Sequence, residues 1–208
     1  VLLVRGADLR LRALSGLCPH RGLPLCEPGH HRLEGLELVC PYHGLRLDLA
    51  GRPRPAGDRM SVPGGPLPEL ALVETLGFAF VSKRPTEAFP PPPRWLADAS
   101  LIGLRAAHRD RAAVRCNWKL LVHNFQESHH FPLVHPELEA RTPWAESDSR
   151  TLADHWLGGA MPLEAGAETV SESSSRMGRP YLAAPADRRM VWDALLFPGV
   201  LTSLQPDY

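Results

Sequence analysis

The N-terminal part of the chain alternates apolar and polar positions in short runs bounded by turn residues. Alternation with a period of two predicts strands that bury one face. The predicted strands cover residues 1–5, 9–15, 36–39, 45–49, 70–76 and 78–82. The Pro- and Gly-rich stretch 52–68 has too few apolar positions for a strand and is predicted to be a loop. We therefore expect a small all-β unit over residues 1–84.

The second half of the chain mixes helical and strand patterns. The proline run within residues 85–94 predicts a stiff, extended connector between two domains. Residues 95–98 predict a helical turn, residues 117–135 predict a mostly helical segment, and the polar stretch 141–155 predicts no element. Strands are predicted over residues 101–116, 156–163, 169–173 and 190–204. Residues 95–208 are therefore expected to form a second, α+β domain.

Composition narrows the classes of function. The chain has 208 residues, of which 44% are hydrophobic, and this is enough to build one large or two small cores. Its 23 basic and 23 acidic residues balance without forming a charged block, so nucleic acids and membrane surfaces are not expected partners. The apolar runs are too short for a membrane span, and we expect a cytoplasmic location. The chain begins inside a strand-like run and stops directly after the apolar run 195–204 with no closing element, so we expect it to be truncated at both ends.

Two short loops carry the strongest chemical signal. The stretches 18–22 (CPHRG) and 40–44 (CPYHG) each supply one Cys and one His. Two Cys and two His could hold a zinc ion or a 2Fe–2S cluster. The cluster is favoured, because one iron can then take two thiolates while the other takes two imidazoles. Zinc fingers more often draw a Cys pair from one element and a His pair from another. The Pro and Gly residues also keep both loops tight and leave backbone N–H groups free to approach sulfides.

A second candidate site lies in the predicted helical segment. Glu127, His130 and His135 fall at positions i, i+3 and i+8. Two imidazoles beside a carboxylate are typical ligands of a mononuclear Fe(II) ion with open positions for O₂. Glu127 and His130 would share one face of a helix, and Pro132 would break the helix so that His135 could turn to the same point. A helix with a polar, His-rich surface is the alternative.

The motifs together resemble the oxygenase (alpha) component of Rieske non-haem iron oxygenases of the aromatic-ring-hydroxylating type. The resemblance rests on the two Cys–His loops, on Asn117-Trp118-Lys119, and on Asn124 with Glu127, His130 and His135-Pro136, in the family's order and separation. It implies a small all-β Rieske domain over 1–84, a linker over 85–94, and over 95–208 the incomplete N-terminal part of a mononuclear iron domain. That second domain is expected to have an α+β, helix-grip-like fold.

The resemblance also implies one 2Fe–2S cluster per chain. Cys18 and Cys40 would ligate one of its irons, and His20 and His43 would ligate the other.

A separate Fe(II) ion is implied for the second domain, with His130 and His135 as ligands. Glu127 matches the family's bridging position, where it would hydrogen-bond an iron-ligating His and connect it to a cluster His of a neighbouring subunit. The third, carboxylate ligand is expected to lie outside this chain, and without it the chain alone is expected to be inactive. The Asp residues after His135 are candidates by type but not by position: Asp148, Asp154, Asp187, Asp193 and Asp207.

As for activity, the resemblance implies an oxidoreductase, the terminal oxygenase component of a monooxygenase or dioxygenase. It would use O₂ and electrons from an NAD(P)H-dependent reductase or a ferredoxin to hydroxylate or N-demethylate a small organic substrate. A homotrimer with electron transfer between subunits is implied. Two alternatives stay open: an alpha subunit of a dioxygenase that dihydroxylates aromatic rings, and a non-catalytic Rieske electron-transfer protein.

The segments 159–163, 166–171 and 197–208 look most like the subgroup that acts on glycine betaine, choline and carnitine. A quaternary ammonium group is bound by aromatic faces. Candidate aromatic residues for that role, each of which could equally be an ordinary core or loop residue, are Trp144, Trp156, Tyr181 and Trp192.

Several further Cys, His and Trp residues are predicted to bind neither metal nor substrate. Cys26 and Cys116 lie outside the motifs and are expected to be small buried residues. Trp118 is expected in the core, and His30 and His31 are expected to face solvent.

Overall fold

The computed structural model describes residues 1–33, 35–55, 63–84, 88–99, 101 and 103–207. The chain divides into two compact units, Val1–Ala88 and Phe89–Tyr208.

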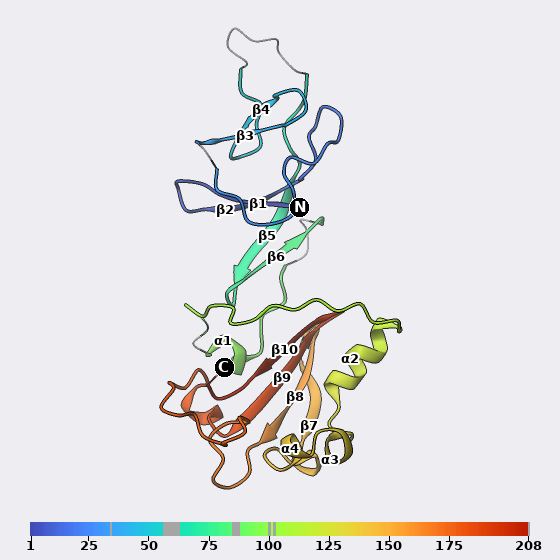
Figure 1. Cartoon of the computed structure of the whole chain (residues 1–208), viewed down its shortest axis with the longest axis vertical. Helices are drawn as coiled ribbons and strands as arrows, with labels where there is room; N and C mark the ends of the chain where they lie inside the picture. Colours follow the sequence, from blue (N-terminus) through green and yellow to red (C-terminus); the bar gives the residue numbers. More distant parts are fainter. Residues whose placement is uncertain (34, 56–62, 85–87, 100, 102, 208) are drawn as a thin grey trace. The chain divides into compact units, whose positions relative to one another are not determined.

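The first unit is built from short antiparallel strands (Figure 1). Its strands are β1 (Leu2–Arg5), β2 (Leu11–Leu14), β3 (Glu37–Val39), β4 (Arg46–Asp48), β5 (Glu69–Thr75) and β6 (Phe78–Ser82). One sheet has the order β1-β2-β5-β6, and β3 pairs with β4 in a second, two-stranded sheet. Both predicted hairpins are present, because β1 pairs with β2 and β5 pairs with β6.

The core of the first unit lies beneath the two predicted metal-binding loops. It combines aliphatic side chains from several strands with two cysteines, namely Val4, Leu14, Cys18, Leu38, Cys40, Leu45, Leu47 and Leu67. A residue in a packed core loses much of its freedom to move. The loops that carry Cys18 and Cys40 are thereby fixed to the strands on either side of them.

The second unit holds one antiparallel sheet with short helices beside it (Figure 1). Its strands, in the spatial order β10-β9-β8-β7, are β7 (Asp148–Ala153), β8 (Trp156–Pro162), β9 (Met190–Leu196) and β10 (Val200–Leu204). Its helices are α1 (Arg94–Ala97), α2 (Trp118–Gln126), α3 (Phe131–Val134), α4 (Pro136–Glu139) and the 3₁₀ helices η1 (Trp144–Glu146) and η2 (Pro185–Asp187). A small cluster of Met161, Leu163, Ala167 and Val191, with Phe131 against it, packs helix α3 onto the sheet.

Strand β8 lies between β7 and β9 and passes very close to both neighbours. A Cβ atom at Gly159 would lie 1.7 Å from the backbone oxygen of Asp148, and a Cβ atom at Gly158 would lie 2.0 Å from the backbone oxygen of Asp193. Glycine therefore permits this close approach of the backbones at both positions.

Two predicted strands are wrong. The described part of residues 101–116 contains no strand, and every side chain from 103 to 116 is exposed, so the segment has no apolar face to bury. Residues 169–173 form turns, in which the Ser171 hydroxyl donates to the backbone oxygen of Ser175 and the Thr169 hydroxyl donates to Asp207. Such side-chain hydrogen bonds compete with strand pairing.

The polar stretch 141–155, for which no element is predicted, contains η1 and strand β7. Two buried-residue predictions also fail, because Cys26 and Cys116 are exposed and the side chain of Trp118 is 45% exposed. Within the described residues, no helix is both long enough and apolar enough to cross a bilayer.

Candidate metal centres

The two Cys–His loops of the first unit have the same backbone hydrogen bonds. The N–H of Cys18 donates to the oxygen of Leu23, and the N–H of Gly22 donates to the oxygen of Cys18. In the second loop the N–H of Cys40 donates to Leu45, and that of Gly44 donates to Cys40. Gly22 and Gly44 both have φ at 73°, a value that favours glycine. The sequence therefore builds one loop geometry twice.

Both loops aim backbone N–H groups at their cysteine sulfur. The N–H groups of His20 and Arg21 face Cys18, and those of Tyr42 and His43 face Cys40. Burial raises the pKa of the Cys18 thiol. Burial acts in the same direction on Cys40, but its two N–H donors and the neighbouring Cys18 thiol hold the pKa of Cys40 below its usual value. N–H groups around a sulfur favour its thiolate form, which is the form that ligates metal.

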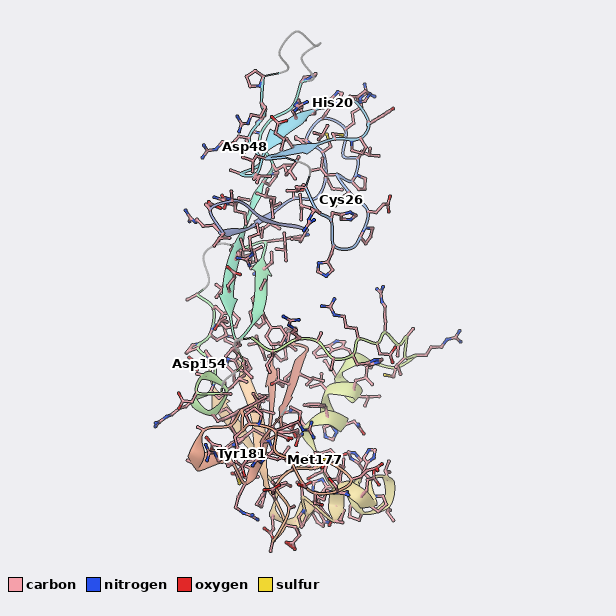
Figure 2. The ribbon with its side chains drawn as sticks, turned by 60° about the vertical axis from the view of Figure 1, so that its left-hand side comes forward. His20, Cys26, Asp48, Asp154, Met177 and Tyr181 are labelled. Atoms are coloured by element: carbon pink, nitrogen blue, oxygen red, sulfur yellow. The ribbon has the colours of Figure 1, made fainter. Side chains whose placement is uncertain are left out.

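The two histidines of the loops also meet. The ring centroids of His20 and His43 lie 4.9 Å apart in an edge-to-face arrangement. The Nδ1 atom of His20 is buried and has no hydrogen-bond partner in the described part of the chain. A buried ring nitrogen without a partner is costly unless it binds something. The structure thus brings Cys18 next to Cys40 and His20 next to His43, whereas Cys26 lies apart from His20 (Figure 2).

In the second unit, Glu127 and His130 meet across a break between two helices. Helix α2 begins at Asn117, whose side chain accepts from the N–H of Lys119, and it ends at Gln126 with Glu127 extended. The Oε1 atom of Glu127 lies 2.6 Å from Nδ1 of His130, while its Oε2 accepts from the N–H of His129 at 2.6 Å. The expectation that Glu127 and His130 share one helix face is therefore wrong, because a turn brings them together.

The position of Pro132 relative to the helices also differs from the prediction. Pro132 lies in the first turn of helix α3 and not inside a continuous helix, so it starts a helix instead of kinking one. His135 then separates α3 from α4, with φ at −132° and ψ at 58°. The ring centroids of His130 and His135 lie 5.3 Å apart. The two imidazoles therefore share one neighbourhood.

Hydrogen bonding determines the charge on Glu127. Partial burial acts to raise the pKa of the Glu127 carboxyl, but the hydrogen bonds from His130 and from the His129 N–H outweigh it and hold this pKa below its usual value. Glu127 is therefore a carboxylate near neutral pH. A carboxylate has about four acceptor positions, so it can accept a further N–H beyond those two.

His130 and His135 both line a cavity of about 240 Å³ in the second unit. Its apolar lining comes from α2, α3, α4, the sheet and the segment between β8 and β9, and consists of Phe125, Phe131, Leu138, Met161, Val170 and Val191. Asn124 and Glu127 contribute polar atoms on the helical side.

The opposite, sheet side of the cavity contains polar residues to which the sequence assigns no role. Asp193 of β9 and Ser203 of β10 line the cavity together with Gln205. Burial raises the pKa of Asp193 to about 6, against an opposing hydrogen bond from Ser203. The signal in the sequence is a single acidic residue inside the otherwise apolar strand Met190–Leu196.

A third ligand does not join the two imidazoles. Among the described residues, no three side chains of His, Cys, Asp or Glu converge as ligands of one metal ion. Asp148 and Asp154 are exposed, and Asp207 is buried against the hydroxyl of Thr169. Of the Asp residues that are candidates by type, Asp193 lines the cavity.

The four aromatic candidates lie elsewhere. Trp156 is buried in the sheet, the rings of Trp192 and Trp95 stack 5.2 Å apart, and Trp144 lies 5.1 Å from the ring of His129. The ring of Tyr181 is covered by the guanidinium groups of Arg176 and Arg188. None of these four lines the described cavity, whose aromatic side chains are Phe125 and Phe131.

Comparison with known proteins identifies the family. Residues 101–208 match the ring hydroxylating alpha subunit (catalytic domain), and this match covers more than half of the chain. The chain belongs to the ring-hydroxylating alpha subunit family. Residues 1–64, which include both Cys–His loops, match the Rieske [2Fe-2S] domain. A comparison with curated protein sequences finds no match.

Solved structures show the same fold as this alpha subunit. The quaternary ammonium Rieske monooxygenase CntA in complex with an inhibitor has a TM-score of 0.70 at 19% identity, over 98% of this chain and 54% of that chain. Naphthalene 1,2-dioxygenase from Rhodococcus sp. has a TM-score of 0.61 at 16% identity, over 97% of this chain and 53% of that chain. The present chain thus spans about half the length of these structures.

Membership of the ring-hydroxylating alpha subunits implies a 2Fe–2S cluster and a mononuclear iron. The first unit fits the cluster, because two buried cysteines, an unpartnered His20 Nδ1 and a matched pair of loops converge there. For the mononuclear iron, the described residues supply two imidazoles and a cavity.

Proposed function

We propose that this chain is part of a terminal oxygenase component that hydroxylates or N-demethylates a small organic substrate with O₂ and electrons from a partner. In this proposal Cys18, His20, Cys40 and His43 hold the 2Fe–2S cluster, and the domain boundary falls within residues 85–94. His130 and His135 hold Fe(II), with a third carboxylate ligand outside this chain. The hydrogen bond between Glu127 and His130, made at the edge of a cavity that also contains His135, carries the proposal.

That hydrogen bond sets the chemistry available at His130. A carboxylate only accepts hydrogen bonds, so Nδ1 of His130 must carry the proton. The Nε2 atom of a neutral His130 then keeps its lone pair and is free to ligate a metal. Glu127 also fixes the orientation of the ring and makes the imidazole a better donor of electron density. Glu127 is therefore assigned a positioning role at the metal and a bridging role toward a cluster His of a neighbouring subunit.

When bound, the cluster supplies electrons and the mononuclear iron supplies the position at which O₂ is activated. The residues of the first unit prepare for the cluster by burying both cysteines and directing N–H groups at their sulfurs. Hydrogen bonds to the sulfurs and burial are two of the means by which a protein adjusts the potential of such a cluster.

The partners in this proposal are an NAD(P)H-dependent reductase or a ferredoxin, and two further copies of the subunit in a homotrimer. A quaternary ammonium compound is the proposed substrate class, supported by the similarity in fold to CntA. Dihydroxylation of an aromatic ring is the second candidate, because six apolar side chains line the cavity.

The test has two stages. The chain is reconstituted anaerobically with iron and sulfide and reduced with dithionite, and its electron paramagnetic resonance spectrum is recorded. We expect the low average g value of a cluster with mixed sulfur and imidazole ligands. A spectrum typical of four thiolates, or a protein that takes up zinc and not iron, would end the proposal.

In the second stage, the complete oxygenase is supplied with NADH and a reductase and is given a quaternary ammonium compound or naphthalene. Formaldehyde or a hydroxylated amine supports the first candidate, whereas a cis-dihydrodiol supports the second. If neither of these substrates, nor a protonated tertiary amine, promotes oxidation of NADH coupled to product, the oxygenase assignment fails.

A further inference from the structure

The polar side of the cavity is organised by one pair of neighbouring strands. Asp193 of β9 and Ser203 of β10 are directly opposite each other in the antiparallel register, and Gln205 follows at the end of β10. We call these three residues the acceptor wall. They line the same cavity as His130 and His135.

Hydrogen bonds within the acceptor wall run in one direction. The Ser203 hydroxyl bonds to the Asp193 carboxylate, which can only accept, so Ser203 donates its single proton there. The Ser203 oxygen in turn accepts from Nε2 of Gln205 at 3.0 Å. This arrangement turns the other atom of the Gln205 amide, Oε1, away from the chain of bonds. Gln205 Oε1 is buried and has no hydrogen-bond partner within the described residues.

Apart from the second N–H of the Gln205 amide, the groups left over on the acceptor wall are acceptors. They are Oε1 of Gln205 and the remaining lone pairs of the Asp193 carboxylate. No Lys, Arg or His of the described chain forms an ion pair with Asp193, which is half-buried. A buried carboxylate without a cation is costly, and so is a buried carbonyl without a donor. The chemical complement of this wall is a cation that carries an N–H group.

We infer that the acceptor wall of Asp193, Ser203 and Gln205 selects substrates that carry a protonated amine, by accepting the amine's N–H in the cavity of His130 and His135. The inference rests on the proposed oxygenase function and changes its substrate class: a protonated amine is preferred to the quaternary ammonium compound proposed above, which has no N–H group to offer. It replaces the expected cage of aromatic faces, because Trp144, Trp156, Tyr181 and Trp192 do not line this cavity. An amine held at the wall keeps its N-alkyl groups in the same cavity as the two imidazoles.

Three small probes of nearly equal size separate charge from hydrogen bonding: N,N-dimethylethanolamine, which is protonated at pH 8, choline, which has no N–H group, and the neutral 3,3-dimethylbutan-1-ol. Binding to the reconstituted chain is measured by calorimetry. We expect the protonated amine to bind about tenfold more tightly than choline, and the neutral alcohol to bind more weakly still, since hydrogen bonds to charged groups have that strength. Equal affinities for the amine and choline would overturn the inference.

Variants then locate the preference. Asp193→Asn keeps the shape of the side chain but removes its charge, and we expect the preference for the amine to fall about tenfold or to disappear. Gln205→Met removes the amide acceptor at similar volume and should reduce the preference as well. Asp148→Asn, which neutralises an exposed carboxylate on β7, is the matched control and should change nothing.

A preference that survives both Asp193→Asn and Gln205→Met would overturn the inference. Circular dichroism and the spectrum of the reduced cluster show whether each variant is folded. Calorimetry does not depend on oxygenation, so failure of the inference and failure of the proposed function give different results: the first changes amine affinity, and the second changes metal content and spectrum.

Discussion

Glu127 directly follows helix α2 and His130 directly precedes helix α3, and the Oε1 atom of the first lies 2.6 Å from the Nδ1 atom of the second. A turn of the chain replaces the helical turn that the spacing of the two residues predicts. The arrangement frees the carboxylate from helical geometry, so its second oxygen can bond the backbone of His129 at the same time.

Glu127→Gln should weaken metal binding at His130 and His135 without changing the cluster. The Gln side chain has an NH₂ group in place of one carboxylate oxygen, so it cannot accept from both Nδ1–H of His130 and the backbone N–H of His129 as Glu127 does, and the imidazole loses its fixed orientation. Loss of such a supporting group lowers metal affinity by about 10- to 100-fold. Titration with Co(II), followed by its visible absorption, measures the change. Glu137→Gln, which neutralises an exposed carboxylate 3.8 Å from His135, should bind Co(II) as the wild type does. Equal affinities for all three proteins would remove the positioning role of Glu127.

His20→Ala should abolish the cluster. The Nδ1 atom of His20 is buried and has no hydrogen-bond partner among the described residues. The ring of His20 lies beside that of His43, and the two described loops contain no third imidazole that could ligate iron in place of His20. Iron content should fall from two atoms per chain toward zero, and the low average g value should be lost. His31→Ala is the control, because His31 is exposed and bonds only to the backbone of Glu27. A reduced spectrum that persists in His20→Ala would show that His20 is no ligand.

The chain alone should bind two irons, both in the cluster. Two imidazoles without a third protein ligand hold Fe(II) weakly, and no third ligand converges on them among the described residues. Chemical iron analysis after reconstitution and desalting measures the stoichiometry. Three tightly bound irons per chain would mean that a third side chain of this chain ligates iron together with His130 and His135. Asp193, which lines the same cavity, would then be the first residue to substitute.

Asp193→Asn should stabilise the protein at neutral pH. The pKa of Asp193 is raised by burial to about 6 in the folded chain from 3.8 for the free group. The folded state therefore holds its proton more tightly, and stability falls as pH rises from about 4 to about 6. Above that range the ionised carboxylate costs at most about 3 kcal/mol, at 1.36 kcal/mol per pKa unit.

Urea unfolding at several pH values tests this. The free energy of unfolding of Asp193→Asn should exceed that of the wild type at pH 8, and the difference should vanish near pH 4. A wild type that is equally stable or more stable at pH 8 would mean that Asp193 has a cationic partner. A stabilising substitution that also removes amine binding would identify a residue kept for function at the expense of stability.

Gly159→Ala should destabilise the second unit on the order of 3 kcal/mol, because the new methyl group would collide with the backbone of β7. Backbone, unlike the end of a flexible side chain, cannot move aside without breaking the pairing of the two strands. Gly199→Ala provides the control, since a Cβ atom there has no neighbour within 4 Å. Thermal unfolding compares the two. Equal melting temperatures would mean that β7 can shift to make room.

Apolar runs on either side of short turns were sufficient to predict both hairpins of the first unit. Burial alternates along β1 but not along β2, β5 or β6, so the structure keeps the pairing more closely than the alternation. The paired Cys–His loops could also be predicted, since their Pro and Gly positions fix a tight backbone. The strands of the second unit were harder to predict from the sequence. Residues 101–116 read as strand yet expose every described side chain from 103 onward, and β7 pairs along the edge of a sheet through a polar sequence. Burial in these segments depends on distant partners and not on local pattern.

Only the part of the candidate site that lies within one short stretch of sequence could be predicted. Glu127, His130 and His135 lie within one short stretch, and their spacing indicates a ligand set. Asp193 and Gln205 reach the cavity only through the pairing of β9 with β10, which spacing along the chain does not reveal. The aromatic cage was expected from residue type alone, and the four residues proposed for it pack or pair elsewhere.

The twin loops of the first unit close independently of each other. Each is held by bonds between its own cysteine, its own glycine and the residue that follows, and no backbone bond crosses from one loop to the other. Substitution of Gly22 therefore leaves the closure at Gly44 intact, and the loop 40–44 keeps its shape when the loop 18–22 is disturbed. Because each loop carries one Cys and one His, evolution can alter one side of the proposed cluster, at both irons, while the other loop keeps its closure.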